Sequence, residues 1–334
     1  MAARVNSPLV HSQAIQSLAV CLAQLGRSAE AIETIEDAYR LAKEVGDFSN
    51  LMRCCNNLPS IIGELASDWR RADEVLREGL DLARRAGAKS HMGWLTGSLG
   101  DIVFRLGRLE EAEALQREAT ALAIEVGDEP LHGMRLTALA AALLFLGRLE
   151  EAEAAHRESI PILNANPEPQ SQIFIPMIEG YLALARRAPG ESADHFEAMI
   201  GQLRRFNVES APEVFTDLVR ALLRADRAGE AEGYRDLSEH GRSPAARANA
   251  LLVEGLLTAD PVEARRLLAE GTAALQQLGL RVDAARAMVD LGRAIGRTGE
   301  DPGPVFDRAR GILVECNARA FLFEIDEAIA GPGA

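Results

Sequence analysis

One nine-residue segment occurs twice in this chain, and its recurrence limits the possible folds more than any other feature. The segment LGRLEEAEA spans residues 106–114 and again residues 146–154, so its two copies begin 40 residues apart. Glycines that follow an apolar-periodic segment recur at nearly the same interval, at Gly46, Gly87 and Gly127. A fixed period of roughly 20 to 50 residues is typical of a stack of repeated units that bury their apolar faces on one another.

Each unit reads as a pair of helices. Gly107 separates two apolar-periodic segments, and Ala112 and Ala119 lie seven residues apart on one face of the second segment. Small residues at that spacing let two helices approach closely. Hydrophobic residues make up 48% of the chain and aromatic residues only 4%, which favours many closely packed helices over one large core. We therefore predict an all-α fold of about eight helical hairpins with repeats of about 40 residues.

The two most regular units resemble the tetratricopeptide repeat. The residues that carry this likeness are Leu99, Gly100, Val103, Gly107, Leu109, Ala112 and Ala119 in the third unit, and Leu139, Ala140, Leu143, Gly147, Leu149, Ala152 and Ser159 in the fourth. The units depart from that family in being about 40 residues long instead of 34, and in lacking its usual tryptophan and its closing proline. The resemblance implies a right-handed α-α superhelix whose concave face is built by the first helix of each hairpin.

The regularity of the pattern divides the chain. Residues 1–10 read as a frayed leader, residues 11–166 as four regular repeats, residues 167–330 as degenerate repeats that end in a capping helix, and residues 331–334 as a tail. Pro59 is expected to kink or restart the first helix of unit two, and Pro161 to interrupt the second helix of unit four. The segment from Phe321 to Ala330 is expected to close the end of the stack.

The last third of the chain, residues 248–330, resembles the C-terminal helical repeats of large bacterial signalling ATPases. GLRVDAARAMVDLGRAIGRTG, residues 279–299, carries most of that likeness. Such repeats follow ATPase modules in nucleotide cyclases and transcriptional activators. The resemblance implies a sensory or regulatory scaffold that associates with an ATPase or cyclase module.

The net charge and the cysteine pattern limit the classes of partner and the cellular compartment that we expect. The net charge of −14 opposes binding to nucleic acid or to an anionic membrane surface, because both require a basic face. No run of about 18 apolar residues could span a membrane, and no signal peptide is recognisable. The four cysteines form no CxxC pair, which favours reduced thiols in the cytoplasm.

No motif for catalysis, a cofactor or a metal is found. The chain has no GxxxxGK[ST] loop, no HExxH and no GxSxG segment. The paired carboxylates Glu110–Glu111 and Glu150–Glu151 fall in the first turn of a helix, where negative charge is stabilised by the helix dipole. Cys54 and Cys55 read as small packing residues, because neighbours on a helix point about 100° apart. We expect a protein that is not an enzyme and holds no cofactor or metal.

The concave face is the expected functional surface. Helical spacing places these residues on or near it: Arg53, Asn56, Trp94, Asp101, Arg105, Met134 and Phe145. Mixed aromatic and polar groups suit a peptide or helix ligand, which indicates a protein- or peptide-binding scaffold in signal transduction. Two alternatives remain open. Trp94 and Phe145 could instead pack between adjacent hairpins, and the chain could be the small-effector-sensing domain of a split or truncated ATPase, cyclase or transcriptional regulator.

Overall fold

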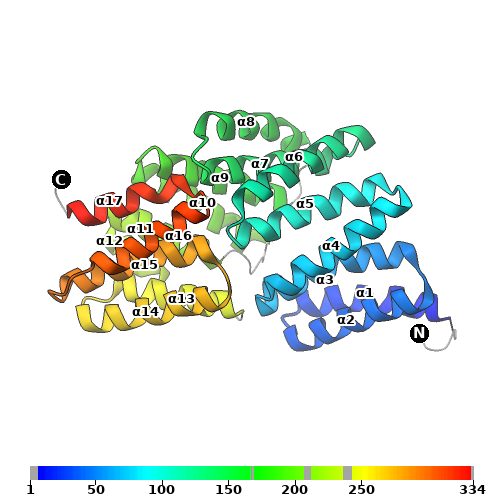
Figure 1. Ribbon diagram of the computed structural model, residues 1–334, viewed down its shortest axis with the longest axis horizontal. Coiled ribbons are helices and arrows are strands. Elements are labelled where there is room, and N and C mark those ends of the chain that lie inside the picture. Colours follow the sequence, from blue (N-terminus) through cyan, green and yellow to red (C-terminus); the bar gives the residue numbers. More distant parts are fainter. Residues whose placement is uncertain (1–6, 166, 168, 207–211, 236–242, 332–334) are drawn as a thin grey trace.

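The computed structural model describes residues 7–165, 167, 169–206, 212–235 and 243–331. Within these residues the chain forms seventeen α-helices that pack in sequence as eight hairpins and one final helix (Figure 1). The predicted all-α solenoid is confirmed. The pairs are α1 (Pro8–Gln24) with α2 (Ser28–Val45), α3 (Phe48–Ala66) with α4 (Trp69–Ala86), α5 (Lys89–Arg105) with α6 (Leu109–Val126), α7 (Glu129–Phe145) with α8 (Leu149–Ala165), α9 (Pro169–Ala185) with α10 (Pro189–Phe206), α11 (Pro212–Arg224) with α12 (Ala228–Ala231), α13 (Pro244–Leu257) with α14 (Pro261–Gln277), and α15 (Arg281–Arg297) with α16 (Gly303–Glu315), followed by α17 (Leu322–Ala330).

Glycine ends the second helix of each of the first three hairpins. Gly46, Gly87 and Gly127 all adopt the left-handed backbone conformation at the C-cap of α2, α4 and α6. An aspartate that follows this glycine begins the next first helix in two cases, because the side chains of Asp47 and Asp128 accept hydrogen bonds from backbone N–H groups in the first turn. The Gly-Asp pair thus ends one hairpin and starts the next.

Several boundaries differ from those expected. α1 begins at Pro8, where proline suits the first helical position, so the leader is shorter than expected and residues 1–6 lie outside the described part of the chain. Pro59 and Pro161 lie inside the continuous helices α3 and α8, so neither proline breaks its helix. Residues 332–334 of the tail also lie outside the described residues.

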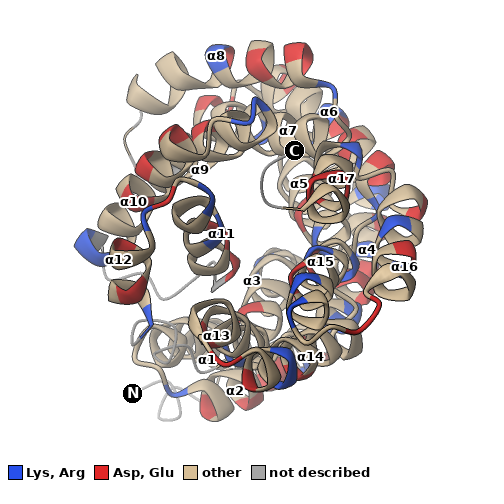
Figure 2. Ribbon diagram, turned by 90° about the vertical axis from the view of Figure 1, so that its left-hand side faces the viewer, with Lys and Arg blue, Asp and Glu red and all other residues tan. Residues whose placement is uncertain are grey.

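Viewed from one end, the hairpins form a coil with two rows of helices (Figure 2). The first helices lie on the inside, and the second helices form the outer rim. Ion pairs join neighbouring outer helices: Lys43 of α2 pairs with Glu78 of α4 at 2.5 Å, and Arg84 of α4 pairs with Glu118 of α6 at 3.0 Å. Because these side chains are exposed, each pair contributes only about 0 to 1 kcal/mol.

The coil closes on itself, because the edge of one turn touches the edge of the next. The turn of hairpin two contacts the start of α13, where the Ala245 N–H donates to Ser67 Oγ at 3.1 Å. The turn of hairpin three contacts α15 and the end of α16, where Asn317 Nδ2 donates to Glu110 Oε1 at 2.9 Å. The turn of hairpin four, at Gly147, packs against Arg319. Hairpins two, three and four thus each meet the segment that begins five hairpins later.

The core is divided between two clusters of buried apolar residues, and α15 belongs to both. Met288 and Val289 pack with the cluster of α7, α9 and α11, whereas Ala284 and Ala287 pack with the cluster of α3, α4 and α5. α17 was expected to cap the end of the stack. It packs on α15 and α16, and the short helix before it (Arg319–Phe321) contacts α7.

Candidate functional site

Each of α3, α5 and α7 places four side chains on the inside of the coil at a 4-3-4 spacing. We call these twelve residues the inner stripe: Arg53, Asn57, Ser60 and Glu64 on α3; Trp94, Ser98, Asp101 and Arg105 on α5; Met134, Ala138, Ala141 and Phe145 on α7. All except Phe145 keep exposed surface, while most other residues of these helices are buried by their neighbours. The stripe changes from polar on α3 to mixed on α5 and apolar on α7.

Three of the residues chosen from the sequence occupy equivalent positions near the start of these helices. Arg53 is exposed, and Trp94 and Met134 are half-buried. The indole Nε1 of Trp94 donates to Asp128 Oδ2 at 3.2 Å, and Asp128 also caps α7. Trp94 therefore both faces the inside of the coil and ties hairpin three to hairpin four.

Polar contacts between successive first helices hold two further residues. Ser98 Oγ donates to Asn56 Oδ1 at 3.2 Å, which places Asn56 between α3 and α5, one position away from the stripe. Asp101 accepts from Gln116 Nε2 at 2.8 Å and from Arg135 Nη1 at 3.0 Å. The Asp101 carboxylate is thus fixed in orientation while about half of its surface stays exposed.

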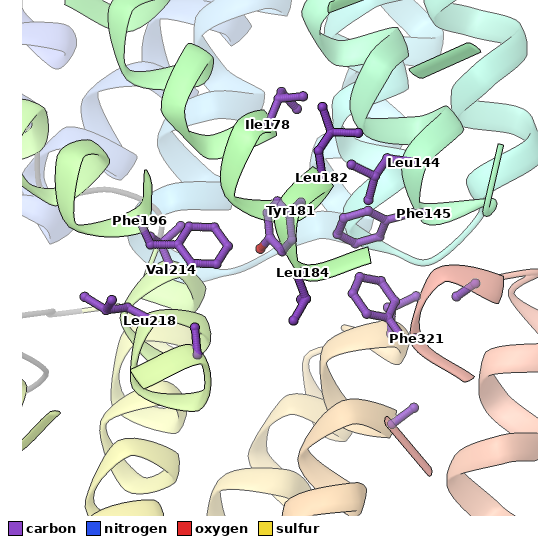
Figure 3. Packing of buried hydrophobic residues seen from close by; sticks show 14 of the residues in the cluster. Leu144, Phe145, Ile178, Tyr181, Leu182, Leu184, Phe196, Val214, Leu218 and Phe321 are labelled. Atoms are coloured by element: carbon purple, nitrogen blue, oxygen red, sulfur yellow. The ribbon is translucent and has the colours of Figure 1, made fainter. Parts of the chain in front are cut away.

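The later turn of the coil covers the far end of the stripe. Arg105 forms an ion pair with Glu213 of α11 at 2.5 Å, and its guanidinium lies 5.7 Å from the Trp69 ring centre. Phe145 is only 7% exposed, with its ring centre 4.7 Å from that of Phe321 and 5.3 Å from that of Tyr181 (Figure 3). The expectation that Phe145 lines an open groove is therefore corrected, since it packs inside an aromatic cluster.

A buried network of charges joins α11, α15 and α17, and the sequence reasoning missed it. Arg286 of α15, 2% exposed, lies 2.7 Å from Asp217 of α11 and donates to both carboxylate oxygens of Glu324 of α17 at 3.0 and 3.1 Å. Arg220 pairs with Asp217 at 2.9 Å and with Asp290 at 2.7 Å. The network fixes α11, α15 and α17 to one another.

Pairing controls the charge state of this network. Burial alone would raise the pKa of Glu324, but the guanidinium groups of Arg286 and Arg224 outweigh it and hold that pKa well below its usual range. Beside the Arg105–Glu213 pair, burial raises the pKa of Asp283 to about 6, and Glu213 acts in the same direction. A hint in the sequence was Glu324, a carboxylate within the otherwise apolar segment FLFEI.

The paired glutamates and the adjacent cysteines that the sequence analysis considered lie at helix starts and in the core. Glu110–Glu111 and Glu150–Glu151 lie in the first turns of α6 and α8, as predicted. Cys54 and Cys55 are fully buried, and burial raises the pKa of each thiol to about 12, which keeps them protonated at neutral pH. In the described ranges, no three His, Cys, Asp or Glu side chains gather as a metal site would require.

Two cavities border the outer helices. One, of about 190 Å³, lies at the contact between successive turns and is lined by Glu110, Glu113, Leu146, Arg148, Asn317 and Arg319. The other, of about 370 Å³, lies between α10 and α12 and is lined by Glu197, Arg204, Gly229, Glu230, Gly233 and Tyr234. Four of the six lining residues are charged in the first cavity and three of six in the second, whereas sites for small organic ligands are mainly apolar. Of the helices described, none is long and apolar enough to cross a bilayer.

Several solved structures are similar to this chain at low sequence identity, and one of them has a TM-score above 0.5. The Rap conjugation gene regulator of plasmid pLS20, solved in complex with the Phr* peptide, has a TM-score of 0.55 and 14% identity over all of this chain and 80% of that one. A tetratricopeptide repeat protein from Parabacteroides merdae has a TM-score of 0.45 and 17% identity over 80% of this chain and 98% of that one. A signal transduction ATPase with a tetratricopeptide repeat sensor from Pyrococcus horikoshii has a TM-score of 0.42 and 12% identity over 98% of this chain and 52% of that one.

Sequence comparisons identify the repeat type. No curated protein sequence matches the chain significantly. Sequence profiles described as tetratricopeptide repeat match residues 12–45, which form the first hairpin, and residues 91–165, which form the third and fourth. The match to the tetratricopeptide repeat thus covers the first, third and fourth hairpins.

Proposed function

We propose that this protein is a non-enzymatic scaffold that binds a protein or peptide segment along the inner stripe. The observation that carries the proposal is the row of exposed and half-buried positions on α3, α5 and α7 at 4-3-4 spacing, on helices whose other residues are mostly buried. Such a row offers a peptide a line of side chains in register from one hairpin to the next. Arg53, Trp94 and Met134 stand at equivalent points on the three helices.

The chemistry of the stripe indicates the kind of segment that would fit. α3 presents Arg53 and Glu64, α5 presents Trp94 and Asp101, and α7 presents Met134. A peptide that crosses the three helices would place charged or polar groups against α3 and apolar groups against α7. The Rap regulator, which shares this fold, was solved with a bound peptide, and this supports a peptide as the ligand.

The biological role that fits such a scaffold is a regulatory one. The likeness of residues 248–330 to the repeats of signalling ATPases supports a module that works with an ATPase or cyclase domain. The four cysteines are free thiols, which supports a reducing cytoplasm as its compartment.

To test the binding face, peptides that bind the folded protein are first selected from a random display library. Their Kd is then measured for the wild type and for variants of the inner stripe. The double variant Trp94→Ala with Met134→Ala should raise the Kd of the selected peptides at least about tenfold, because aromatic anchors dominate such interfaces. Arg105 is left unchanged, since it pairs with Glu213. Ile124→Ala, at a 60% exposed position on the outer helix α6, is the control and should leave Kd unchanged.

Circular dichroism of each variant confirms that the fold is retained. Equal peptide affinity of the folded double variant and the wild type would exclude the inner stripe as the binding face. Stabilisation by small metabolites, with no peptide selected at all, would favour the effector-sensing alternative.

A further inference from the structure

The outward face of α1 carries an apolar stripe that stays exposed among the described residues. Ala14, Leu18, Cys21 and Leu25 follow a 4-3-4 spacing, and all four are exposed, Leu18 by 50% and Leu25 by 71%. Between Pro8 and Gln24 the helix contains no Asp, Glu, Lys or Arg. A spacing of three and four residues aligns these side chains along one side of a helix, as in the seam of a two-helix coil.

The position of Leu18 is buried in each of the next three hairpins. Leu18 corresponds to Leu58, Leu99 and Leu139, which are 0%, 1% and 5% exposed. The first helix of each of those hairpins packs on the second helix of the preceding hairpin. Gly79 of α4, for example, packs against Leu95 of α5, the equivalent of Ala14. α1 therefore presents a helix-accepting surface of the same design, at the N-terminal end of the array (Figure 1).

The stripe is complementary to itself when two copies meet antiparallel. With the two-fold axis between Leu18 and Cys21, Leu18 faces Cys21 of the second copy, and Ala14 faces Leu25. Each large side chain then lies opposite a small one, as close helix packing requires. A two-fold contact of this kind uses the same patch on both copies.

The net charge opposes self-association, but the stripe itself carries no charge. Two copies that each carry a net charge of −14 repel one another, and the repulsion is weakest where the contact surfaces hold no charge. We propose that α1 is a homodimerisation surface, on which α1 of a second copy packs antiparallel through Ala14, Leu18, Cys21 and Leu25. This surface is separate from the inner stripe, so the dimer and the peptide site are independent.

The mass of the protein in solution, measured by sedimentation over a range of concentrations, gives the first test. The wild type should be a dimer, and Leu18→Glu should be a monomer with unchanged helicity, because the two-fold axis would place two carboxylates in the apolar seam. Ile124→Glu, at an exposed site on α6, is the matched control and should remain a dimer. A monomeric wild type, or a dimeric Leu18→Glu variant, would overturn the proposal.

Disulfide trapping tests the orientation. In a Cys21→Ser background, Ala14→Cys combined with Leu25→Cys should give a covalent dimer on oxidation, because the antiparallel register brings the two positions together. Within one chain the two lie eleven residues apart, about 16 Å along the helix, too far for a disulfide, which needs Cα atoms within about 7 Å. The other cysteines, Cys54, Cys55 and Cys316, are buried. Cross-linking of either single-cysteine variant as strongly as the double variant would indicate a parallel contact and overturn the antiparallel arrangement.

Discussion

The turn inside each of the first six hairpins contains one residue with a left-handed backbone. Such residues recur from the first hairpin to the sixth at intervals of 39 to 41 residues: Gly26, Ser67, Gly107, Gly147, Arg187 and Asp226. Three of them are not glycine, although left-handed geometry costs other residues roughly 1 kcal/mol or more. The left-handed turn position therefore recurs even where glycine has been replaced by another residue. For this reason the glycine pattern in the sequence fades after the fourth hairpin, while the hairpins themselves continue.

Gly107 has a second constraint besides its φ of 76°. A Cβ atom at this position would lie 3.0 Å from Cys316 Sγ and 3.3 Å from Arg281 Cβ, both in the next turn of the coil. Gly127 has a similar φ of 71° but no atom within 4 Å of its Cβ position. Gly107→Ala should therefore lower the free energy of unfolding by about 1 kcal/mol more than Gly127→Ala, through overpacking.

Urea denaturation of both variants measures this difference, with Gly127→Ala as the control for backbone strain. Equal losses in the two variants would show that the contact between turns yields without cost.

At the scale of helices, the buried ion network makes α17 part of the interior. Glu324 of α17 is 2% exposed and is held by Arg286 and Arg224. Glu324→Gln should destabilise the protein by about 3 kcal/mol, because it leaves buried guanidinium groups without their full counter-charge. The measurement is the free energy of unfolding in urea at neutral pH.

Glu327→Gln is the matched control on the same helix. Glu327 is 40% exposed and lies 4.0 Å from Arg224, so its loss should change stability by less than about 1 kcal/mol. Similar effects of the two substitutions would mean that α17 is bound by its apolar face alone.

Local signals account for most helix positions. Pro212, Pro244 and Pro261 each begin a helix, as their place in the apolar pattern predicts. The spacing along α5 likewise brought Trp94, Asp101 and Arg105 to one side of a helix. Nothing local could show that Glu213 reaches Arg105 or that Phe321 covers Phe145, because these partners lie far apart in the chain and meet only when the coil closes.

The whole molecule differs from an open solenoid, in which each repeat contacts only its neighbours. Contacts between hairpins that are five apart should make unfolding cooperative from end to end. The chain offers a direct test, because its two tryptophans lie near its start: Trp69 is in hairpin two and Trp94 is in hairpin three. Glu324→Gln, at the far end of the chain, should shift the midpoint of tryptophan fluorescence as far as the midpoint of helicity.

In an array with neighbour contacts alone, the tryptophan midpoint would stay near that of the wild type. A second, separate transition in the variant would show that the two turns of the coil unfold independently.

The contact between turns also has a mechanical consequence. A spring whose coils already touch resists compression but can still be drawn out. Here Ser67 meets Ala245, and Gly147 meets Arg319, so the coil has no free pitch to give up along those edges. A peptide bound to the inner stripe could therefore not shorten the coil. Such a peptide could only move the turns apart, which would lengthen the molecule along the axis of the coil.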